Sequence, residues 1–307
     1  MKYQVIGTSG IEVSRIAFGA WEVGGGTAWD CDDQAAGNMV AALPDIGINF
    51  IDTAKVYGTG RSEELLGKAL KGKRHDFILA SKGGMNWRDG SGERFCYDRD
   101  GRSVYQNTSP EALRLDLEES LTRLDTDYLD LLLLHRPDPL MNADETARGL
   151  ENVVRAGKVR AVGVSNFTPS QIDLLAARLP FPVVTNQIEH SVLETSALYD
   201  GRLDHAQRLR YAPMVWSPLG GGALFTGEGK REDRVREALA KAAHAHGTDD
   251  ISAVAIAWLL RHPARLVPVL GTMKPQRLAQ LAGALDIELD RQHWFAILEA
   301  SEGRPVP

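Results

Sequence analysis

The feature of this sequence that most constrains its fold is a regular alternation of short apolar runs with longer segments of helical period. Eight runs have the length of a buried strand, and several show no polar–apolar alternation, which is typical of strands covered on both faces. These runs occupy residues 15–18, 49–51, 77–80, 129–134, 159–164, 182–185, 214–216 and 266–270. Helical periodicity occurs between them at residues 62–70, 110–124, 143–156, 169–178, 234–246 and 252–261. The pattern predicts repeated strand–helix units.

Repeated strand–helix units with no low-complexity linker predict a single α/β domain over residues 1–307, folded as a (β/α)8 barrel, also called a TIM barrel. A chain of this length is long enough for one such barrel. Residues 3–6 and 11–13 are joined through Gly-Thr-Ser-Gly and are expected to form an N-terminal β-hairpin that closes the barrel floor. Residues 290–300 are expected to add an extra C-terminal helix.

Three places depart from the regular alternation. Pro44 lies inside the first helical segment, residues 32–47, and we expect that helix to kink or stop near Ala42 because proline removes a backbone hydrogen bond. Residues 83–108 and 218–233 follow strands and are longer than a connection needs. Because the loops after the strands form the active face of such barrels, we expect both segments to cover a site, with a flexible surface loop as the alternative.

Ionisable side chains stand at the ends of three consecutive predicted strands. Asp52 closes the second strand, Lys82 the third and His135 the fourth. Tyr57 follows five residues after Asp52. One such residue alone is as readily explained by a structural ion pair. Because the carboxyl ends of parallel strands meet on one rim, four of them together indicate a catalytic site.

These residue types suit the reduction of a carbonyl group. A tyrosine with an ordinary pKa of about 10 is a poor acid at neutral pH, and a lysine ammonium beside it is expected to lower that pKa. Asp52 would keep Lys82 charged and in place, while His135 would orient a carbonyl oxygen. Such a site would protonate the oxygen as its carbon receives a hydride.

On these residues and the motifs around them, the chain resembles the aldo-keto reductases, a family with the same barrel fold. The motifs follow the family's order and extend over nearly the whole chain. They occupy residues 52–58, 62–67, 81–82, 134–135, 163–167, 186–189 and 216–219. The resemblance implies an NADP-dependent oxidoreductase in which Tyr57 donates the proton. Its catalytic tetrad would consist of Asp52, Tyr57, Lys82 and His135.

The resemblance also implies residues that bind the nicotinamide end of a cofactor. Ser165, Asn166 and Gln187 would bind the carboxamide. Trp216 would stack on the ring, and Ala20, in the turn after the first strand, would also contact the cofactor. Taken alone, Ser165 and Asn166 would be interpreted as a helix cap and Trp216 as a core residue.

A glycine-containing loop resembles the family's pyrophosphate-gripping loop. Glycines there let backbone amides approach phosphate closely, and a flexible hinge is the alternative interpretation. The residues concerned are Ser217, Pro218, Leu219 and Gly221.

A segment after the eighth strand resembles the one that reads the ribose 2′-phosphate. It contains Gly271, Thr272, Lys274, Arg277 and Gln280. The positive charges of Lys274 and Arg277 favour NADPH/NADP+, and a solvated helix face is the alternative for both residues. NADH stays as the alternative cofactor, because this chain has Gln280-Leu281 where family members often have Glu-Asn.

The expected substrate is a small carbonyl compound, such as an aliphatic, aromatic or sugar-derived aldehyde. Its pocket is expected above the tetrad, with Trp21 from the first loop and Trp87 from the long segment after the third strand in its walls. No nucleic-acid or membrane partner is expected, and no oligomeric state is predicted.

Composition and motifs exclude several other classes. A formal net charge of −6 is opposite to the basic excess of nucleic-acid-binding proteins. No apolar run reaches the roughly 18 residues of a membrane span, and the N-terminus carries no secretory signal, so a cytoplasmic location is expected. Cys31 and Cys96 have no CxxC partner, and His244 and His246 lie on different faces of a helix, so no metal site is expected. Neither a Rossmann nor a hydrolase glycine motif follows a strand.

Two alternative functions would use the same residues. A low-turnover redox sensor or accessory subunit would bind the cofactor and regulate a partner, but it would not need an intact tetrad. A lyase or isomerase that uses Lys82 as a Schiff-base nucleophile would leave Tyr57, Ser165 and Gln187 without a purpose. The sequence therefore favours the reductase.

Overall fold

A computed structural model of the chain describes residues 1–25, 31–87, 94–99 and 102–306. Eight parallel strands close into a barrel in the order β10-β11-β12-β13-β3-β4-β5-β9. In chain order the strands are β3 (Ala17–Gly19), β4 (Phe50–Asp52), β5 (Ile78–Gly83), β9 (Leu129–Leu134), β10 (Val159–Ser165), β11 (Val183–Glu189), β12 (Met214–Trp216) and β13 (Val267–Leu270). The predicted barrel is confirmed, and each predicted run supplies one strand, with boundaries that match the prediction or differ from it by a few residues.

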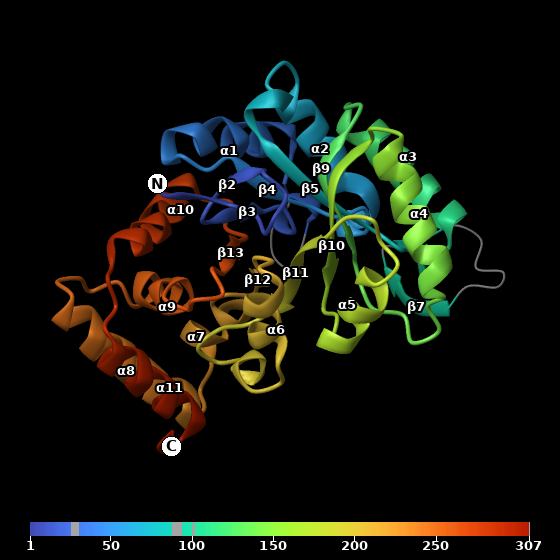
Figure 1. Cartoon of the computed structure of the whole chain (residues 1–307). Helices are drawn as coiled ribbons and strands as arrows, with labels where there is room; N and C mark the ends of the chain where they lie inside the picture. The colour runs from blue at the N-terminus through green and yellow to red at the C-terminus, as the bar shows by residue number, and fades with distance from the viewer. Residues whose placement is uncertain (26–30, 88–93, 100–101, 307) are drawn as a thin grey trace.

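Helices surround the barrel (Figure 1), and their apolar faces pack on the outward-facing side chains of the strands to form the main core. They are α1 (Asp33–Ile46), α2 (Arg61–Leu70), α3 (Pro110–Leu124), α4 (Ala143–Arg155), α5 (Pro169–Ala176), α6 (Arg202–Leu209), α7 (Ala223–Thr226), α8 (Lys230–Ala245), α9 (Ile251–Leu260), α10 (Pro275–Ala282) and α11 (Arg291–Glu302). Short 3-10 helices are η1 (Glu22–Gly24), η2 (Tyr57–Gly60), η3 (Arg74–Asp76), η4 (Ser196–Leu198), η5 (Gly220–Gly222) and η6 (Gly283–Asp286). Helix α11 is the extra helix that the sequence predicts.

The opening segment forms the predicted hairpin from β1 (Tyr3–Val5) and β2 (Glu12–Ser14). Its side chains Ile6, Ile11 and Val13 are buried in a second core, together with inward-facing residues of the barrel strands. These partners include Ala17 and Phe50, the first residues of β3 and β4. The hairpin therefore fills the barrel at the end opposite the carboxyl ends of the strands.

The expected stop of the first helix near Ala42 is wrong, because α1 continues through Pro44 to Ile46. Pro44 lies in the last turn, where its missing N–H affects one hydrogen bond only. The chain then ends the helix with Gly47 at a φ of 82°, and the N–H of Ile48 donates to the Leu43 carbonyl at 2.9 Å. Burial of the inner face of α1, including Leu43, holds the last turn against the core.

The two long segments fold into elements of their own. Residues 83–108 contain β6 (Met85–Asn86), β7 (Arg94–Arg99) and β8 (Arg102–Gln106), which form an antiparallel sheet in the order β6-β8-β7. Residues 88–93 and 100–101 of this segment lie outside the described residues. Residues 218–233 contain η5, α7 and the start of α8.

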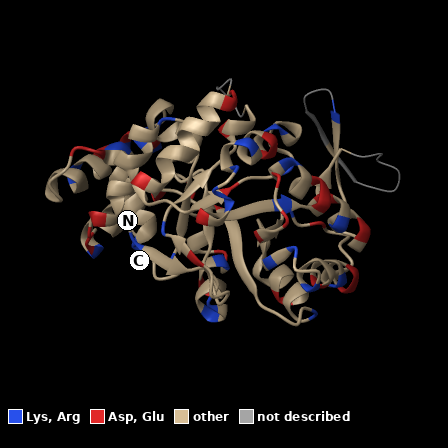
Figure 2. Ribbon diagram, turned by 90° about the horizontal axis from the view of Figure 1, so that it is seen from above, with Lys and Arg blue, Asp and Glu red and all other residues tan. Residues whose placement is uncertain are grey.

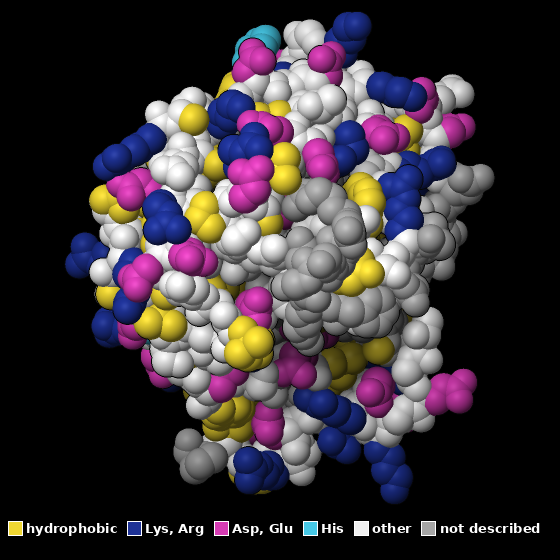
Figure 3. Space-filling model, turned by 90° about the vertical axis from the view of Figure 1, so that its right-hand side faces the viewer, with side chains coloured by type: hydrophobic (Ala, Val, Ile, Leu, Met, Phe, Trp, Pro, Cys, Tyr) yellow, Lys and Arg dark blue, Asp and Glu magenta, His cyan; other side chains and the backbone are white. Residues whose placement is uncertain are grey.

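Charged side chains of both signs are interspersed around the molecule. Figure 2 shows Lys and Arg among Asp and Glu on the surrounding helices, and Figure 3 shows the same mixture on one face, with hydrophobic side chains singly or in small groups where the surface is not grey. None of the helices in the described ranges is both long enough and apolar enough to cross a membrane.

Candidate active site

Four ionisable side chains converge at the carboxyl ends of β4, β5 and β9. Asp52 is the last residue of β4, Lys82 pairs with Leu133 across β5 and β9, and His135 directly follows β9. Tyr57 begins η2, just after β4. The Lys82 Nζ atom lies 2.8 Å from Asp52 Oδ2 and 3.0 Å from the Tyr57 hydroxyl. The structure therefore brings together the residues that the strand ends predict.

The ammonium of Lys82 is buried and surrounded by oxygen atoms. It donates to both carboxylate oxygens of Asp52, at 2.9 and 2.8 Å, and to the Thr53 carbonyl at 2.9 Å. Burial alone would lower the pKa of Lys82, but the Asp52 carboxylate and the Tyr57 hydroxyl outweigh it and raise the pKa above its ordinary value. Lys82 is therefore held in its charged form.

The pKa of Tyr57 is raised above its ordinary value, which corrects the expectation from the sequence. Burial of the phenol is the largest cause, and the Asp52 carboxylate adds to it. Lys82 acts in the predicted direction and lowers the pKa, but it does not reverse the shift. The neighbouring ammonium can be inferred from the sequence, whereas the burial of the phenol depends on the packed structure. Consequently the hydroxyl carries its proton at neutral pH.

His135 is neutral at physiological pH. Burial lowers its pKa well below the usual value, and the positive charges of Lys82 and Arg136 lower it further. Its ring lies edge-on to that of Tyr57, with the two centroids 5.9 Å apart and the planes at 77°. The neutral ring can donate a hydrogen bond beside the Tyr57 hydroxyl without supplying a proton itself.

The turn that carries Tyr57 depends on a close approach between two glycines. Gly58 has a φ of 57°, and a Cβ there would overlap the carbonyl group of Gly24 in η1. A Cβ on Gly24 would in turn lie 2.7 Å from the carbonyl carbon of Tyr57. A side chain at either position would displace the phenol from Lys82.

Of the two tryptophans predicted for the substrate pocket, Trp21 contacts Tyr57 directly, and Trp87 packs against an apolar cluster that Tyr57 also contacts. The ring of Trp21 packs edge-on against that of Tyr57, with the centroids 4.8 Å apart and the planes at 85°. Trp87 and Tyr57 pack against the same small apolar cluster, in which Met85 of β6 and Val104 of β8 are buried. The small sheet therefore forms a wall next to the phenol.

Three residues predicted for nicotinamide binding form a hydrogen-bonded row at the ends of β10 and β12. The Asn166 side-chain nitrogen donates to Ser165 Oγ at 2.9 Å, and the Trp216 indole nitrogen donates to Asn166 Oδ1 at 3.0 Å. Asn166 has a φ of 62°, so the chain turns sharply where β10 ends. The half-buried indole of Trp216 is fixed by this row.

Gln187 links that row to the tetrad. Its backbone carbonyl accepts hydrogen bonds from Ser165 Oγ at 3.1 Å and from the Asn166 N–H at 2.8 Å. Its side-chain nitrogen donates to Asp52 Oδ1 at 2.9 Å. Strands β11 and β4 lie on opposite sides of the ring of strands, so this bond crosses the barrel. The sequence did not predict the bond to Asp52, because the spacing of residues along a chain does not indicate which side chains meet across a barrel.

Ala20 is fully buried just after β3. Its N–H donates to the Asp52 carbonyl at 2.8 Å, and its own carbonyl accepts from Ser62 Oγ at 2.8 Å. The backbone of Ala20 therefore links the end of β3 to Asp52, the last residue of β4.

The glycine-containing loop after β12 contains four residues in left-handed conformation. Ser217 has a φ of 49°, and Gly220, Gly221 and Gly222 have φ values of 64°, 61° and 97°. The Gly220 N–H donates to the Ser217 carbonyl at 2.8 Å, which closes a tight turn, while Pro218 is buried and Leu219 half-buried. Left-handed backbone of this kind can present successive N–H groups to an anion.

The residues predicted to bind the adenosine end of a cofactor lie at the start of α10, and Arg277 among them reaches α7, which follows the glycine loop. Lys274 is the N-terminal cap of α10, and its N–H donates to Thr272 Oγ1 at 3.3 Å. Arg277 stacks over the Phe225 ring of α7 at 5.6 Å. Gly271, Lys274, Arg277 and Gln280 are all exposed.

A buried ionic layer that the sequence analysis missed supports both sides of Lys82. The Lys55 ammonium lies 2.7 Å from the carboxylate of Asp116, which also accepts the Gly84 N–H at 2.8 Å. The Glu63 carboxylate accepts from Ser81 Oγ at 2.6 Å. Glu63 belongs to a motif of the resemblance, and its position on the apolar face of α2 is the signal that could have revealed its burial.

Comparisons with known proteins agree with this geometry. The sequence model of the aldo/keto reductase family matches residues 15–302. A curated 6-dehydroglucose reductase of Agrobacterium fabrum is 40% identical over 302 residues, covering 96% of this chain and 97% of the relative. A second protein of that name, from Novosphingobium aromaticivorans, is 40% identical over 314 residues, covering 99% of this chain and 97% of the relative.

Among solved structures, glycerol dehydrogenase AKR11B4 of Gluconobacter oxydans is similar over 99% of this chain and 97% of that chain, with a TM-score of 0.85 and 27% identity. The closed barrel, the charged cluster at its mouth and the match over nearly the full length lead to one assignment. This chain belongs to the aldo-keto reductase family of oxidoreductases.

Proposed function

We propose that this protein reduces small aldehydes or ketones to alcohols with NADPH, and that Tyr57 donates the proton. Membership of an oxidoreductase family supports carbonyl reduction in general. The observation that carries the specific proposal is the buried contact of 3.0 Å between Lys82 Nζ and the Tyr57 hydroxyl. A protonated phenol beside a fixed cation suits a general acid, because the cation stabilises the phenolate that remains.

The residues predicted to bind the cofactor fit a nicotinamide dinucleotide. Trp216, fixed by Asn166, provides a flat aromatic surface at the barrel mouth. The left-handed turn at residues 217–222 suits a pyrophosphate, and the first turn of α10 with Lys274 suits a further phosphate. When bound, the reduced nicotinamide supplies the hydride.

The chain's own side chains handle the carbonyl oxygen and the proton. Neutral His135 donates a hydrogen bond to that oxygen and orients it. Tyr57 transfers its hydroxyl proton to the same oxygen as the carbon is reduced. Lys82 stabilises the phenolate. Asp52 and the Thr53 carbonyl keep the ammonium in place, so that little reorganisation is needed during the reaction.

Lys274 and Arg277 support NADPH rather than NADH. Both are exposed cations at the start of α10, Lys274 as its N-terminal cap and Arg277 in its first turn, where they could form charge-assisted hydrogen bonds to a 2′-phosphate. NADH is the alternative, in which these two residues remain a solvated helix face. Measuring KM for NADPH and for NADH in Lys274→Ala/Arg277→Ala distinguishes the two alternatives.

A sugar-derived aldehyde is the substrate class that the relatives support, because two of them are named 6-dehydroglucose reductase. Trp21 and Trp87 would then pack against the carbon face of the substrate near Tyr57. The proposal includes a reducing, cytoplasmic setting, in which Cys31 and Cys96 stay as thiols.

The hydrogen bonds of Lys82 argue against a Schiff-base lyase. A nucleophilic lysine needs a lowered pKa, whereas Asp52 and Tyr57 raise the pKa of Lys82 and occupy its N–H groups. A redox sensor on the same fold would bind NADPH with little turnover, and kinetics distinguish it from the reductase.

The test is to mix the purified protein with NADPH and a panel of aldehydes that includes sugar-derived ones, and to follow the absorbance of the reduced nicotinamide. We expect turnover that falls by about 10²–10⁴-fold in Tyr57→Phe, because the general acid is lost. NADPH binding, followed by its fluorescence, should persist in that variant. Tyr211→Phe is the matched control, because this buried phenol precedes β12 at the opposite end of that strand.

Three results would contradict the proposal. Unchanged turnover in Tyr57→Phe would remove Tyr57 as the proton donor. Tight NADPH binding without consumption across the panel would favour the sensor. A covalent adduct at Lys82 after borohydride treatment with substrate would favour the lyase.

A further inference from the structure

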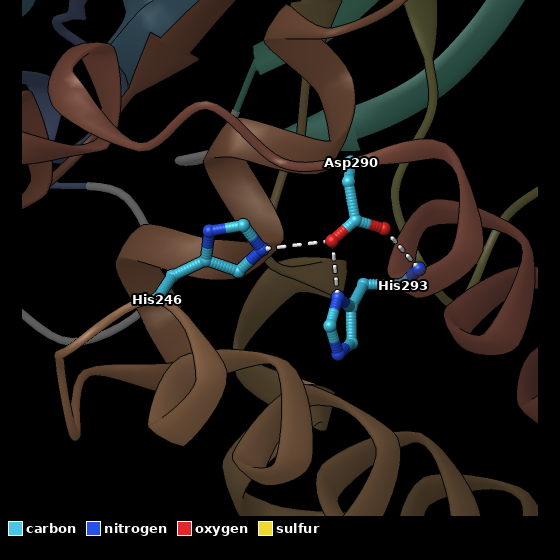
Figure 4. Close-up of side chains that lie close together, drawn as sticks. All are labelled: His246, Asp290 and His293. Carbon is cyan, nitrogen blue, oxygen red and sulfur yellow. Dashed lines mark hydrogen bonds and ion pairs between the residues drawn. The ribbon is translucent and has the colours of Figure 1, made fainter.

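Three side chains that can ligate a metal meet where α8 ends and α11 begins (Figure 4). His246 caps the C-terminus of α8, Asp290 caps the N-terminus of α11, and His293 lies in the first turn of α11. Ligand atoms from the three residues lie within 4.8 Å of one another. They belong to helices outside the barrel and are not part of the candidate active site.

Both imidazole rings face the same carboxylate oxygen. Oδ2 of Asp290 is 2.7 Å from His293 Nδ1 and 3.5 Å from His246 Nε2. In a tetrahedral zinc site with bonds of about 2.0–2.1 Å, neighbouring ligand atoms are about 3.3 Å apart. The contact with His246 is close to that spacing, and the contact with His293 would need to lengthen by about 0.6 Å. A small rotation of the His293 ring, which is 31% exposed, is enough for this change.

The carboxylate is already fixed, and one imidazole nitrogen lacks a hydrogen bond. Oδ1 of Asp290 accepts the backbone N–H of His293 at 2.9 Å, so that Oδ2 is directed toward the two rings. Within the described part of the chain, His246 Nε2 is shielded from solvent and makes no hydrogen bond. A shielded imidazole nitrogen that makes only a long contact of 3.5 Å with Asp290 Oδ2 and no hydrogen bond is poorly satisfied, and a bound cation between the two atoms would satisfy it.

The donor set selects the kind of ion. Mg²⁺ and Ca²⁺ prefer oxygen ligands, whereas imidazole nitrogen combined with a carboxylate suits zinc and similar divalent transition metals. The side chain of Asp290 is 50% exposed, which leaves room for water to complete the coordination. We propose that His246, Asp290 and His293 form a binding site for a divalent transition-metal ion of the zinc type.

The site would act on stability rather than on catalysis. Helices α8 and α11 pack side by side in an antiparallel manner, because Arg231 near the start of α8 contacts Ser301 near the end of α11. That end of α11 reaches the loop after β11, where Glu302 accepts from Thr195 at 2.6 Å. A helix of 12 residues is about 18 Å long, so the metal site lies well away from that loop. An ion there would join the far ends of the two helices.

The experiment is a calorimetric titration of the purified, chelator-treated full-length protein with Zn²⁺. We expect one equivalent to be bound by the parent chain and lost in Asp290→Asn, His246→Ala and His293→Ala. Asp290→Asn is the most informative variant, because asparagine caps a helix as well as aspartate and the fold should be retained. His244→Ala is the matched control, since His244 is exposed on α8 two residues before His246.

Thermal unfolding gives a second readout. Zn²⁺ at about 100 times its Kd should raise the Tm of the parent and of His244→Ala by a few degrees, and should leave the Tm of Asp290→Asn unchanged. The proposal is overturned if the parent binds no equivalent, if Asp290→Asn binds as much Zn²⁺ as the parent, or if His244→Ala loses as much as the ligand variants. Binding at the cysteine thiols would persist in Asp290→Asn and would therefore give the second of these results.

Discussion

The catalytic end of the candidate site and the end proposed to bind the adenosine of the cofactor, here called the adenosine end, hold their charged side chains in different ways. At the catalytic end, the side chains of Lys82 and Asp52 are at most 3% exposed and joined by two hydrogen bonds. At the adenosine end, Lys274 and Arg277 are exposed, and Arg277 rests on the ring of Phe225. The first pair is held by the barrel, whereas the second lies on one helix at the surface.

This difference distinguishes a property that the whole fold determines, the geometry of the tetrad, from one that a few surface residues can change, the proposed cofactor preference. A buried ion pair is costly to split, because the remaining charge has neither water nor a partner. Exposed charges are screened by salt and contribute little when they have no bound ligand. The tetrad geometry is therefore tied to the stability of the barrel, while the cofactor preference can change without affecting it.

Splitting the buried pair should have the largest effect. Lys82→Met leaves the Asp52 carboxylate buried without its cation, so we expect a loss of about 3–5 kcal/mol in the free energy of unfolding. We also expect turnover to fall at least about 100-fold, because the phenolate of Tyr57 loses its stabilising charge. Denaturant unfolding and steady-state kinetics measure the two effects separately.

The double variant Asp52→Asn/Lys82→Met is the control for this prediction. It removes both charges, so most of the lost stability should return while turnover stays low. The bond from Gln187 to position 52 can still form with an asparagine oxygen. If Lys82→Met unfolds at the same denaturant concentration as the parent, the Lys82–Asp52 ion pair does not contribute to the stability of the barrel, and the prediction is wrong.

The pH dependence of turnover is the second test of the catalytic end. In the proposed reaction Tyr57 must be protonated, and burial raises the pKa of its hydroxyl, so the loss of this proton moves to higher pH. His135 must stay neutral, and burial lowers its pKa well below 6.5, so its protonation moves to lower pH. We expect kcat for reduction to be constant from pH about 6 to about 9 and to fall only in the alkaline range above pH 10.

The measurement is a profile of kcat in buffers of equal ionic strength. A fall in turnover on the acid side, centred near the ordinary histidine pKa of about 6.5, would show that His135 titrates as a solvated ring and would contradict the enclosed site. An alkaline fall below pH 9 would show that Lys82, rather than burial, dominates the pKa of Tyr57.

The barrel could be predicted because its signal is local. Strands covered on both faces give apolar runs that can be read directly, and Leu129–Leu134 matches its predicted bounds. The stop predicted near Ala42 was wrong because one lost hydrogen bond at Pro44 weighs less than the burial of Leu43 and its neighbours on α1. Local rules thus fail where packing outweighs them.

The site was predictable in its residues and less so in its energetics. Strand ends place Asp52, Lys82 and His135 on one rim, since that follows from topology alone. The direction of the Tyr57 pKa shift depends on desolvation, which only the packed structure determines. The partners of His246 come from a helix distant in sequence, so the spacing of His244 and His246 could not indicate them.

The adenosine end should show the smallest effect. In Lys274→Ala/Arg277→Ala, we expect KM for NADPH to rise about 10-fold, which corresponds to about 1.4 kcal/mol of charge-assisted hydrogen bonding to a phosphate. KM for NADH and kcat with either cofactor should stay nearly constant, because neither residue contacts the tetrad. Steady-state kinetics with both cofactors measure the difference.

Phe225→Ala is the graded control, since it removes only the ring under Arg277 and should raise KM for NADPH less than about 3-fold. An equal rise in KM for NADH would mean that these cations act on the whole dinucleotide or on the helix itself. In that case Lys274 and Arg277 at the surface would support the structure of the site, as the buried pair of Lys82 and Asp52 does.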